Sequence, residues 1–169
     1  MNAKETLLLC LEQSQRYLTQ ALDGLTQMEF AWSPNTESNS IAFILWHIAR
    51  VEDYYVTRVI QRLPELYEAE GWRKKMGTPV KNTGFEYNAE QLKNWPVPEL
   101  ETLKGYADSV RGKTLVFLES IPAEKLSETY RPERSPEDSG TLLARISTEL
   151  TMHVGQICYL RGIQRGLDK

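Results

Sequence analysis

The sequence predicts an all-α fold, a four-helix bundle in a single domain that spans residues 1–169. Four long stretches, 3–27, 41–61, 98–120 and 140–166, repeat apolar residues at steps of three and four, the period of a helix with one buried face. Two connections are short and one is long, so tight hairpins cannot join every pair of neighbouring helices. A chain of 169 residues, 41% hydrophobic and 25% charged, has the composition of one ordinary globular domain.

The first two helices follow from leucine spacing and from a capping signal. Leucines recur along one face of residues 3–27, while polar residues fill the opposite face. Ser40 and the two polar residues before it offer N-caps for the helix at 41–61. The apolar stripe of this helix runs through Ile44, and His47 follows three residues later on the same face. A titratable imidazole therefore lies within a core-facing stripe.

The segment 63–97 changes character, because it is rich in glycine, proline and tryptophan. We expect a short helix near 65–70 and a short helical turn near 89–94 within an irregular crossing. A connection of this length is usually functional or a crossover between the ends of a bundle. After the helix at 98–120 comes a polar loop, 127–139, which begins with a short β piece at Thr129–Tyr130.

The last helix, 140–166, carries a carboxylate and an imidazole inside its apolar stripe. Glu149 and His153 are four residues apart, so their side chains lie on one face, about one turn from each other. Polar groups on a core-facing stripe need partners that satisfy them.

Composition argues against several classes of partner. The net charge is −3, with basic and acidic residues interleaved, so no basic face indicates nucleic-acid binding. The longest apolar run, 41–46, is too short to span a bilayer, and the N-terminal leucine cluster lacks the features of a signal peptide. Cys10 and Cys158 lie on predicted helical faces, where we expect core thiols rather than a disulfide. We therefore expect a cytoplasmic protein that binds neither nucleic acid nor membrane.

His47, Glu149 and His153 form a candidate metal site. The chain has only two histidines, and both lie on core-facing stripes. The stripes of a bundle converge on one interior, so the three side chains can meet. Two imidazoles and one carboxylate suffice to bind a divalent transition metal and leave coordination positions open.

Other interpretations of these residues stay open at this point. His47 could be a core histidine bonded to a backbone carbonyl. Glu149 could be solvated, or paired with Arg145 four residues before it. The histidines and the glutamate could also form a hydrogen-bonded cavity without metal.

Two segments resemble the signature segments of the DinB/YfiT-like family: S-I-A-F-I-L-W-H-I-A-R-V-E-D-Y-Y in the second helix and H-V-G-Q-I-C-Y-L-R in the last. The resemblance extends to G-Y-A-D-S-V-R at 105–111 and to the tryptophan-rich crossing. It implies an up-down-down-up bundle, often a homodimer, that binds a divalent metal through three histidines. His47 and His153 match the first and last of these, and Glu149 occupies the position of the middle one.

The exchange of a histidine for Glu149 lowers the net charge of the predicted site from +2 to +1 and weakens the Lewis acidity of its metal. Zinc or nickel is expected from the resemblance, and a two-histidine, one-carboxylate set also suits iron or manganese. Similar proteins include S-transferases that use a low-molecular-weight thiol, whose pKa the metal would lower. The expected function is thus a metal-dependent S-transferase or hydrolase that acts on a small molecule.

The alternative is a non-catalytic bundle that binds a small ligand or acts through dimerisation. Trp46, next to His47, is expected in the core or at a dimer contact. Residues that could line the cavity or bind a ligand are Tyr54, Tyr55, Gln156 and Arg161.

Overall fold

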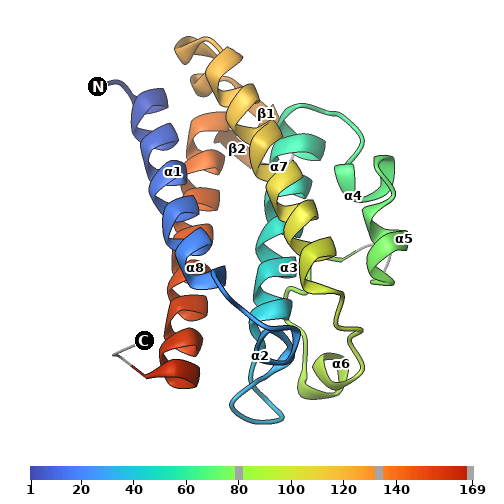
Figure 1. Ribbon diagram of the computed structural model, residues 1–169. Helices are drawn as coiled ribbons and strands as arrows, with labels where there is room; N and C mark the ends of the chain where they lie inside the picture. Colours follow the sequence, from blue (N-terminus) through green and yellow to red (C-terminus); the bar gives the residue numbers. More distant parts are fainter. Residues whose placement is uncertain (79–81, 132–134, 167–169) are drawn as a thin grey trace.

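The structure, a computed structural model, describes residues 1–78, 82–131 and 135–166 (Figure 1). Helices make up most of these residues, and the only sheet among them is one short antiparallel pair, so the all-α prediction is confirmed. The elements are α1 (Ala3–Leu22), α2 (Gln27–Ala31), α3 (Ile41–Glu52), a π-helix (Asp53–Ile60), α4 (Leu66–Ala69), α5 (Trp72–Met76), α6 (Ala89–Lys93), α7 (Leu100–Ser120), a 3₁₀ helix (Ala123–Ser127), β1 (Thr129–Arg131), β2 (Ser135–Asp138) and α8 (Ser139–Arg165).

Four long helices make the bundle. Helix α8 packs against α1 and α3, and α3 also packs against α7. In Figure 1, α1 and α8 run downward, whereas α3 and α7 run upward. Because α3 and α7 run in the same direction, the chain must return along the bundle between them. The described parts of the segment 61–99, which contain α4, α5 and α6, belong to this return.

Most predicted helices are found close to their predicted bounds. The helices expected at 98–120 and 140–166 are α7 and α8, and the short helices expected near 65–70 and 89–94 are α4 and α6. The β piece expected at Thr129–Tyr130 is part of β1, whereas α5 and β2 were not predicted. Residues 79–81 of the predicted crossing and 132–134 of the predicted polar loop lie outside the described residues.

Two long predicted helices differ in detail. The prediction of one helix over 3–27 is wrong at its end, because Gly24 adopts a left-handed conformation (φ +57°) and Thr26 then caps α2. The stretch predicted at 41–61 is helical, but its second half, Asp53–Ile60, is a π-helix. One-turn π segments occur frequently at functional sites.

Helix α3 is buried along its whole length. Every residue from Ile41 to Glu52 is buried, including Trp46, which belongs to the core. Helices α2, α7 and α8 pack against α3, and Gly84 of the return segment lies against Phe43 and Trp46. Any polar side chain on α3 must find its partner inside the protein.

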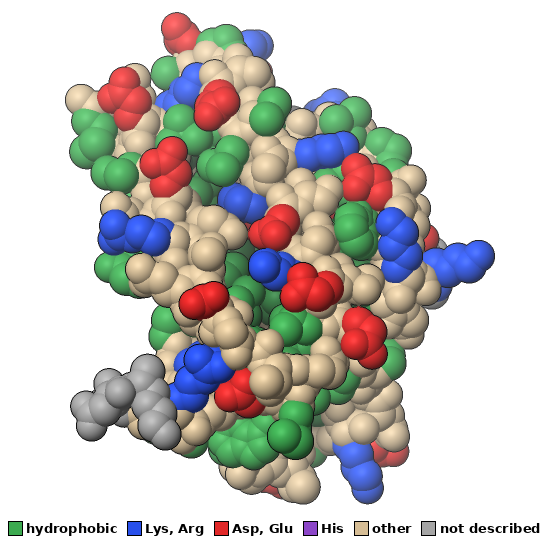
Figure 2. Space-filling view, in the orientation of Figure 1, with side chains coloured by type: hydrophobic (Ala, Val, Ile, Leu, Met, Phe, Trp, Pro, Cys, Tyr) green, Lys and Arg blue, Asp and Glu red, His purple; other side chains and the backbone are tan. Residues whose placement is uncertain are grey.

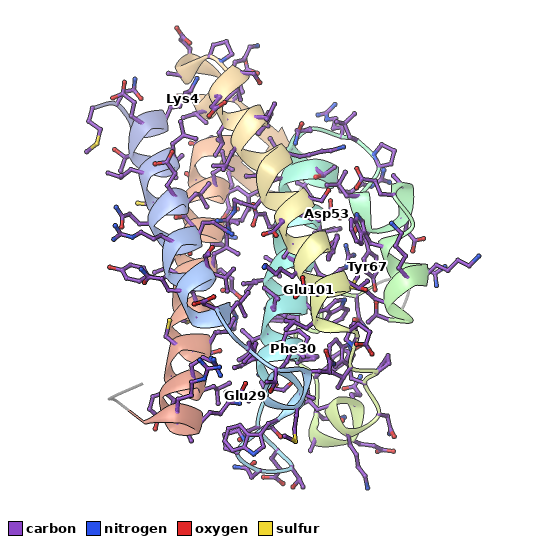
Figure 3. All side chains as sticks on the ribbon, viewed as in Figure 1. Lys4, Glu29, Phe30, Asp53, Tyr67 and Glu101 are labelled. Atoms are coloured by element: carbon purple, nitrogen blue, oxygen red, sulfur yellow. The ribbon has the colours of Figure 1, made fainter. Side chains whose placement is uncertain are left out.

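Asp53 follows α3 directly and is fully buried (labelled in Figure 3). Its carboxylate accepts hydrogen bonds from the backbone N–H groups of Leu66 (3.0 Å) and Tyr67 (2.9 Å) and from the Tyr106 hydroxyl (2.9 Å). Burial raises the pKa of Asp53, although these hydrogen bonds favour the ionised form. Asp53 thereby attaches the first turn of α4 to the end of α3.

Arg111 and Glu52 form a buried ion pair between α7 and α3. The guanidinium donates three hydrogen bonds to Glu52, from Nε to Oε1 (2.9 Å), from Nε to Oε2 (3.3 Å) and from Nη2 to Oε2 (3.0 Å). Its Nη1 donates to the backbone carbonyl of Leu11 and to the side chain of Gln15, each at 3.1 Å. One side chain therefore links α1, α3 and α7.

The prediction that Cys10 and Cys158 are core thiols is wrong, because both are exposed and free. They line a shallow groove between α1 and α8 rather than the faces that meet in the core. Among the described helices, none is both long enough and apolar enough to cross a membrane. The face of the molecule in Figure 2 carries basic and acidic side chains interspersed, without a patch of one sign.

We expect Arg111→Met to lower the free energy of unfolding by about 3–5 kcal/mol, because it leaves the Glu52 carboxylate buried without its partner. Urea denaturation would measure the loss. The control is Lys125→Ala, which removes the exposed pair with Glu128 and should cost under about 1 kcal/mol. Equal losses in the two variants would contradict the structural role of the buried pair.

Candidate metal centre

Three ligand-capable side chains converge from two helices. His47 comes from α3, and Glu149 and His153 come from α8. Glu149 Oε1 lies 3.5 Å from His47 Nε2 and 3.2 Å from His153 Nε2. One ligand atom from each residue lies within 4.8 Å of the other two. The structure thus brings together the three residues that the sequence singled out.

The backbone fixes which nitrogen of a neutral His47 ring carries the proton. Nδ1 of His47 lies 2.5 Å from the carbonyl oxygen of Thr83. A carbonyl only accepts hydrogen bonds, so Nδ1 carries the proton and donates. In a neutral ring, Nε2 then presents a lone pair toward Glu149.

His153 has the same arrangement. Its Nδ1 lies 2.8 Å from Oε1 of Gln156, which accepts, so the lone pair of Nε2 also faces Glu149. Gln156 is therefore placed at the site, where it orients a histidine instead of lining the cleft. When both rings are neutral, the three facing atoms are all acceptors, and no other described side chain donates a hydrogen between them.

A divalent ion fits this donor set. Ligand atoms about 2.0–2.1 Å from a tetrahedral zinc lie about 3.3–3.4 Å from one another. The two distances to Glu149, 3.5 and 3.2 Å, bracket that value. If His47 were an imidazolium that donated to Glu149, the bond would be about 2.7–2.9 Å long, shorter than the one observed. The two distances to Glu149 are therefore compatible with a shared cation.

Glu149 does not pair with Arg145. The guanidinium of Arg145 instead contacts the carboxylate of Glu137 in β2, just before α8. The carboxylate of Glu149 lies between the two imidazoles. The alternative in which Glu149 turns away to pair with Arg145 is therefore not observed.

A cleft of about 840 Å³ opens beside the site, and His47 and Glu149 form part of its wall. Tyr54 and Tyr55, which were expected to line a cavity, both line this cleft. They belong to the π-helix, whose i→i+5 bonds widen the turn, so consecutive side chains diverge less than on an α-helix. No histidine is visible on the face drawn in Figure 2.

The prediction that Arg161 lines the cavity is wrong. Its guanidinium donates to the carbonyls of Ala21 (2.9 Å) and Asp23 (3.3 Å), so it fastens α8 to the end of α1. It also pairs with Glu29 at 3.2 Å. Hydrogen bonds from Thr26 and from Arg165 lower the pKa of Glu29 (labelled in Figure 3) to about 2. Arg161 is thus a structural residue at the far end of α8.

A model of the DinB superfamily matches residues 11–157 of the chain. The chain belongs to the DinB superfamily. A crystal structure described as the conserved protein of locus from Enterococcus faecalis matches this DinB chain with a TM-score of 0.86. The two chains are 21% identical, and the match covers 99% of each, so it shows a shared fold. No curated protein matches this chain.

Thr83 and Gly84 position the His47 ring of the candidate metal centre, and neither residue was predicted from the sequence. Thr83 acts through its backbone carbonyl, which leaves no side-chain signal. Gly84 has φ +81°, and a Cβ at that position would lie 2.7 Å from the rings of Phe43 and Trp46. The only available signal was this glycine within an aromatic-rich segment, a sign of close backbone approach.

We expect Gly84→Ala to push Thr83 away from α3 and to release the His47 ring. The overpacking should cost about 1–3 kcal/mol of unfolding free energy. ¹H–¹⁵N NMR should show that the hydrogen-bonded Nδ1–H of His47 exchanges faster. Gly71→Ala is the matched control, because Gly71 also has a positive φ (+71°) but nothing within 4 Å of its Cβ position. An unchanged His47 signal in the Gly84 variant would contradict the proposed link.

Proposed function

We propose that this DinB-superfamily protein binds one divalent metal ion through His47, Glu149 and His153 and uses it in chemistry on a small molecule. The observation that supports the proposal is the meeting of three acceptor atoms with no donor between them among the described residues. Lone pairs that face one another repel, and a cation turns that repulsion into attraction. The preference of such sites for transition metals follows from the nitrogen and oxygen donors.

Each residue has a defined task in this proposal. The Thr83 carbonyl and the Gln156 amide hold the two imidazoles with Nε2 directed at the centre. Glu149 supplies one negative charge, which leaves the loaded site at +1. Zinc or nickel is the expected ion, and iron or manganese also suits the ligand set. When bound, the ion would act as a Lewis acid that lowers the pKa of a thiol or water ligand.

The class of reaction that we propose is thiol-dependent S-transfer or hydrolysis. Three protein ligands leave coordination positions open, as catalytic sites require. The cleft of about 840 Å³ beside His47 provides room for a substrate or a low-molecular-weight thiol. A cytoplasmic location and a homodimer remain part of the proposal.

Elemental analysis of protein purified without chelator or nickel resin should find one divalent ion per chain. Zinc added to stripped protein at about 100 times its Kd should raise the free energy of unfolding by about 2.7 kcal/mol. His47→Ala, Glu149→Ala and His153→Ala should each abolish this gain, because two ligands remain.

Met152→Ala is the control for these variants. Met152 lies on α8 beside His153, but its side chain is exposed and is not a ligand. The control should keep the full gain. Metal-independent unfolding of the unsubstituted protein, or a gain that survives in all three ligand variants, would refute the proposed site.

A further inference from the structure

The cleft beside His47 and Glu149 has apolar walls along most of its length. Val51, Leu142 and Ile146 supply aliphatic surface from α3 and α8. The aromatic side is formed by three rings, those of Tyr54, Tyr55 and Phe85. A volume of about 840 Å³ exceeds what a metal with water ligands needs and falls within the range of sites for drug-sized ligands, about 300–1,000 Å³.

The charged residues that line the cleft are already paired. Arg50 Nη2 lies 2.6 Å from Glu65, and its guanidinium also stacks 3.9 Å above the ring of Tyr67. Away from the metal centre, two more pairs complete the set, Glu68 with Arg73 at 2.7 Å and Arg145 with Glu137.

These ion pairs disfavour a charged ligand in the cleft. A ligand charge placed against any of the three pairs would compete with an ion pair that already exists or lie beside an equal charge. Among the described residues that line the cleft, Glu149 is the only acidic or basic side chain that is not paired with an Arg, Asp or Glu of opposite charge. The wall therefore favours shape, apolar contact and neutral polar groups over charge as the source of specificity.

We propose that the ligand of this cleft is an uncharged small molecule with a long aliphatic or aromatic body and one polar head. The body lies against Tyr54, Tyr55 and Phe85. The head reaches His47 and Glu149, and this part rests on the proposed metal site. The tyrosine hydroxyls have no hydrogen-bond partner among the described residues, so they can bind a neutral polar group on the body.

Four hydroxamates test the body while the metal-binding head stays constant. Acetohydroxamate has no body, and octanohydroxamate has a neutral aliphatic one. The monohydroxamate of suberic acid has a body that ends in a carboxylate, and 8-aminooctanohydroxamate has one that ends in an ammonium. With zinc-loaded protein, calorimetry should show octanohydroxamate binding at least about 100-fold more tightly than acetohydroxamate, because its extra methylenes are buried. Either terminal charge should remove at least about tenfold of that gain.

Phe85→Ser locates the body in the cleft. Phe85 is 71% exposed, so the variant should fold, and it should reduce the octanohydroxamate gain at least threefold while acetohydroxamate binding stays unchanged. Tyr159→Ser is the matched control, since Tyr159 is also 71% exposed but lies outside the cleft. Equal affinities for the short and the long neutral probe, tighter binding of a charged probe, or equal effects of the two variants would overturn the inference.

Binding of 1-octanol to metal-stripped protein separates this inference from the proposed function. If the protein binds no metal but does bind octanol, and Phe85→Ser weakens octanol binding, the inferred ligand class is supported and the proposed metal site is refuted. If zinc binds but neither chain length nor Phe85 matters, the metal site stands and the ligand class falls. Absence of octanol binding in the stripped protein, together with chain-length independence in the loaded one, would also overturn the inference.

Discussion

Every residue of helix α3 is buried, and the arrangement of the molecule follows from the polar groups on and just after this helix. Glu52 requires Arg111, which fixes α7 and α1 against α3. Asp53 requires the amides at the start of α4, which fixes where the return segment begins. A buried charge without a partner costs several kcal/mol, so these contacts constrain the fold more strongly than apolar packing, which tolerates exchange.

The same constraint separates the structural polar groups from the candidate functional ones. Arg111 and Glu52 neutralise each other and use their donors and acceptors internally. His47 differs, because its Nδ1 is satisfied by a carbonyl while its Nε2 faces only further acceptors. A bundle could have satisfied His47 with a hydroxyl or an amide. The convergence of Glu149 and His153 on that atom is therefore the feature that a packing role does not explain.

Sequence periodicity was enough to predict the four long helices and to place His47, Glu149 and His153 on interior faces, because helical spacing determines which side chains share a stripe. It could not predict Thr83, since a carbonyl contact depends on where the return segment crosses α3. Nor did it place Arg161, whose position in a helical pattern is compatible with either a cavity or an end contact. From the sequence, Glu149 can pair with Arg145 or face the histidines, and only the structure shows that Arg145 pairs with Glu137.

The central claim is that one ion is held by two imidazoles and one carboxylate. X-ray absorption at the zinc K-edge, on protein loaded with one equivalent of zinc, tests it most directly. The account predicts scattering from two imidazole rings, with the remaining ligands oxygen and no sulfur. A sulfur ligand from the exposed Cys10 or Cys158, or fewer than two imidazoles, would contradict it.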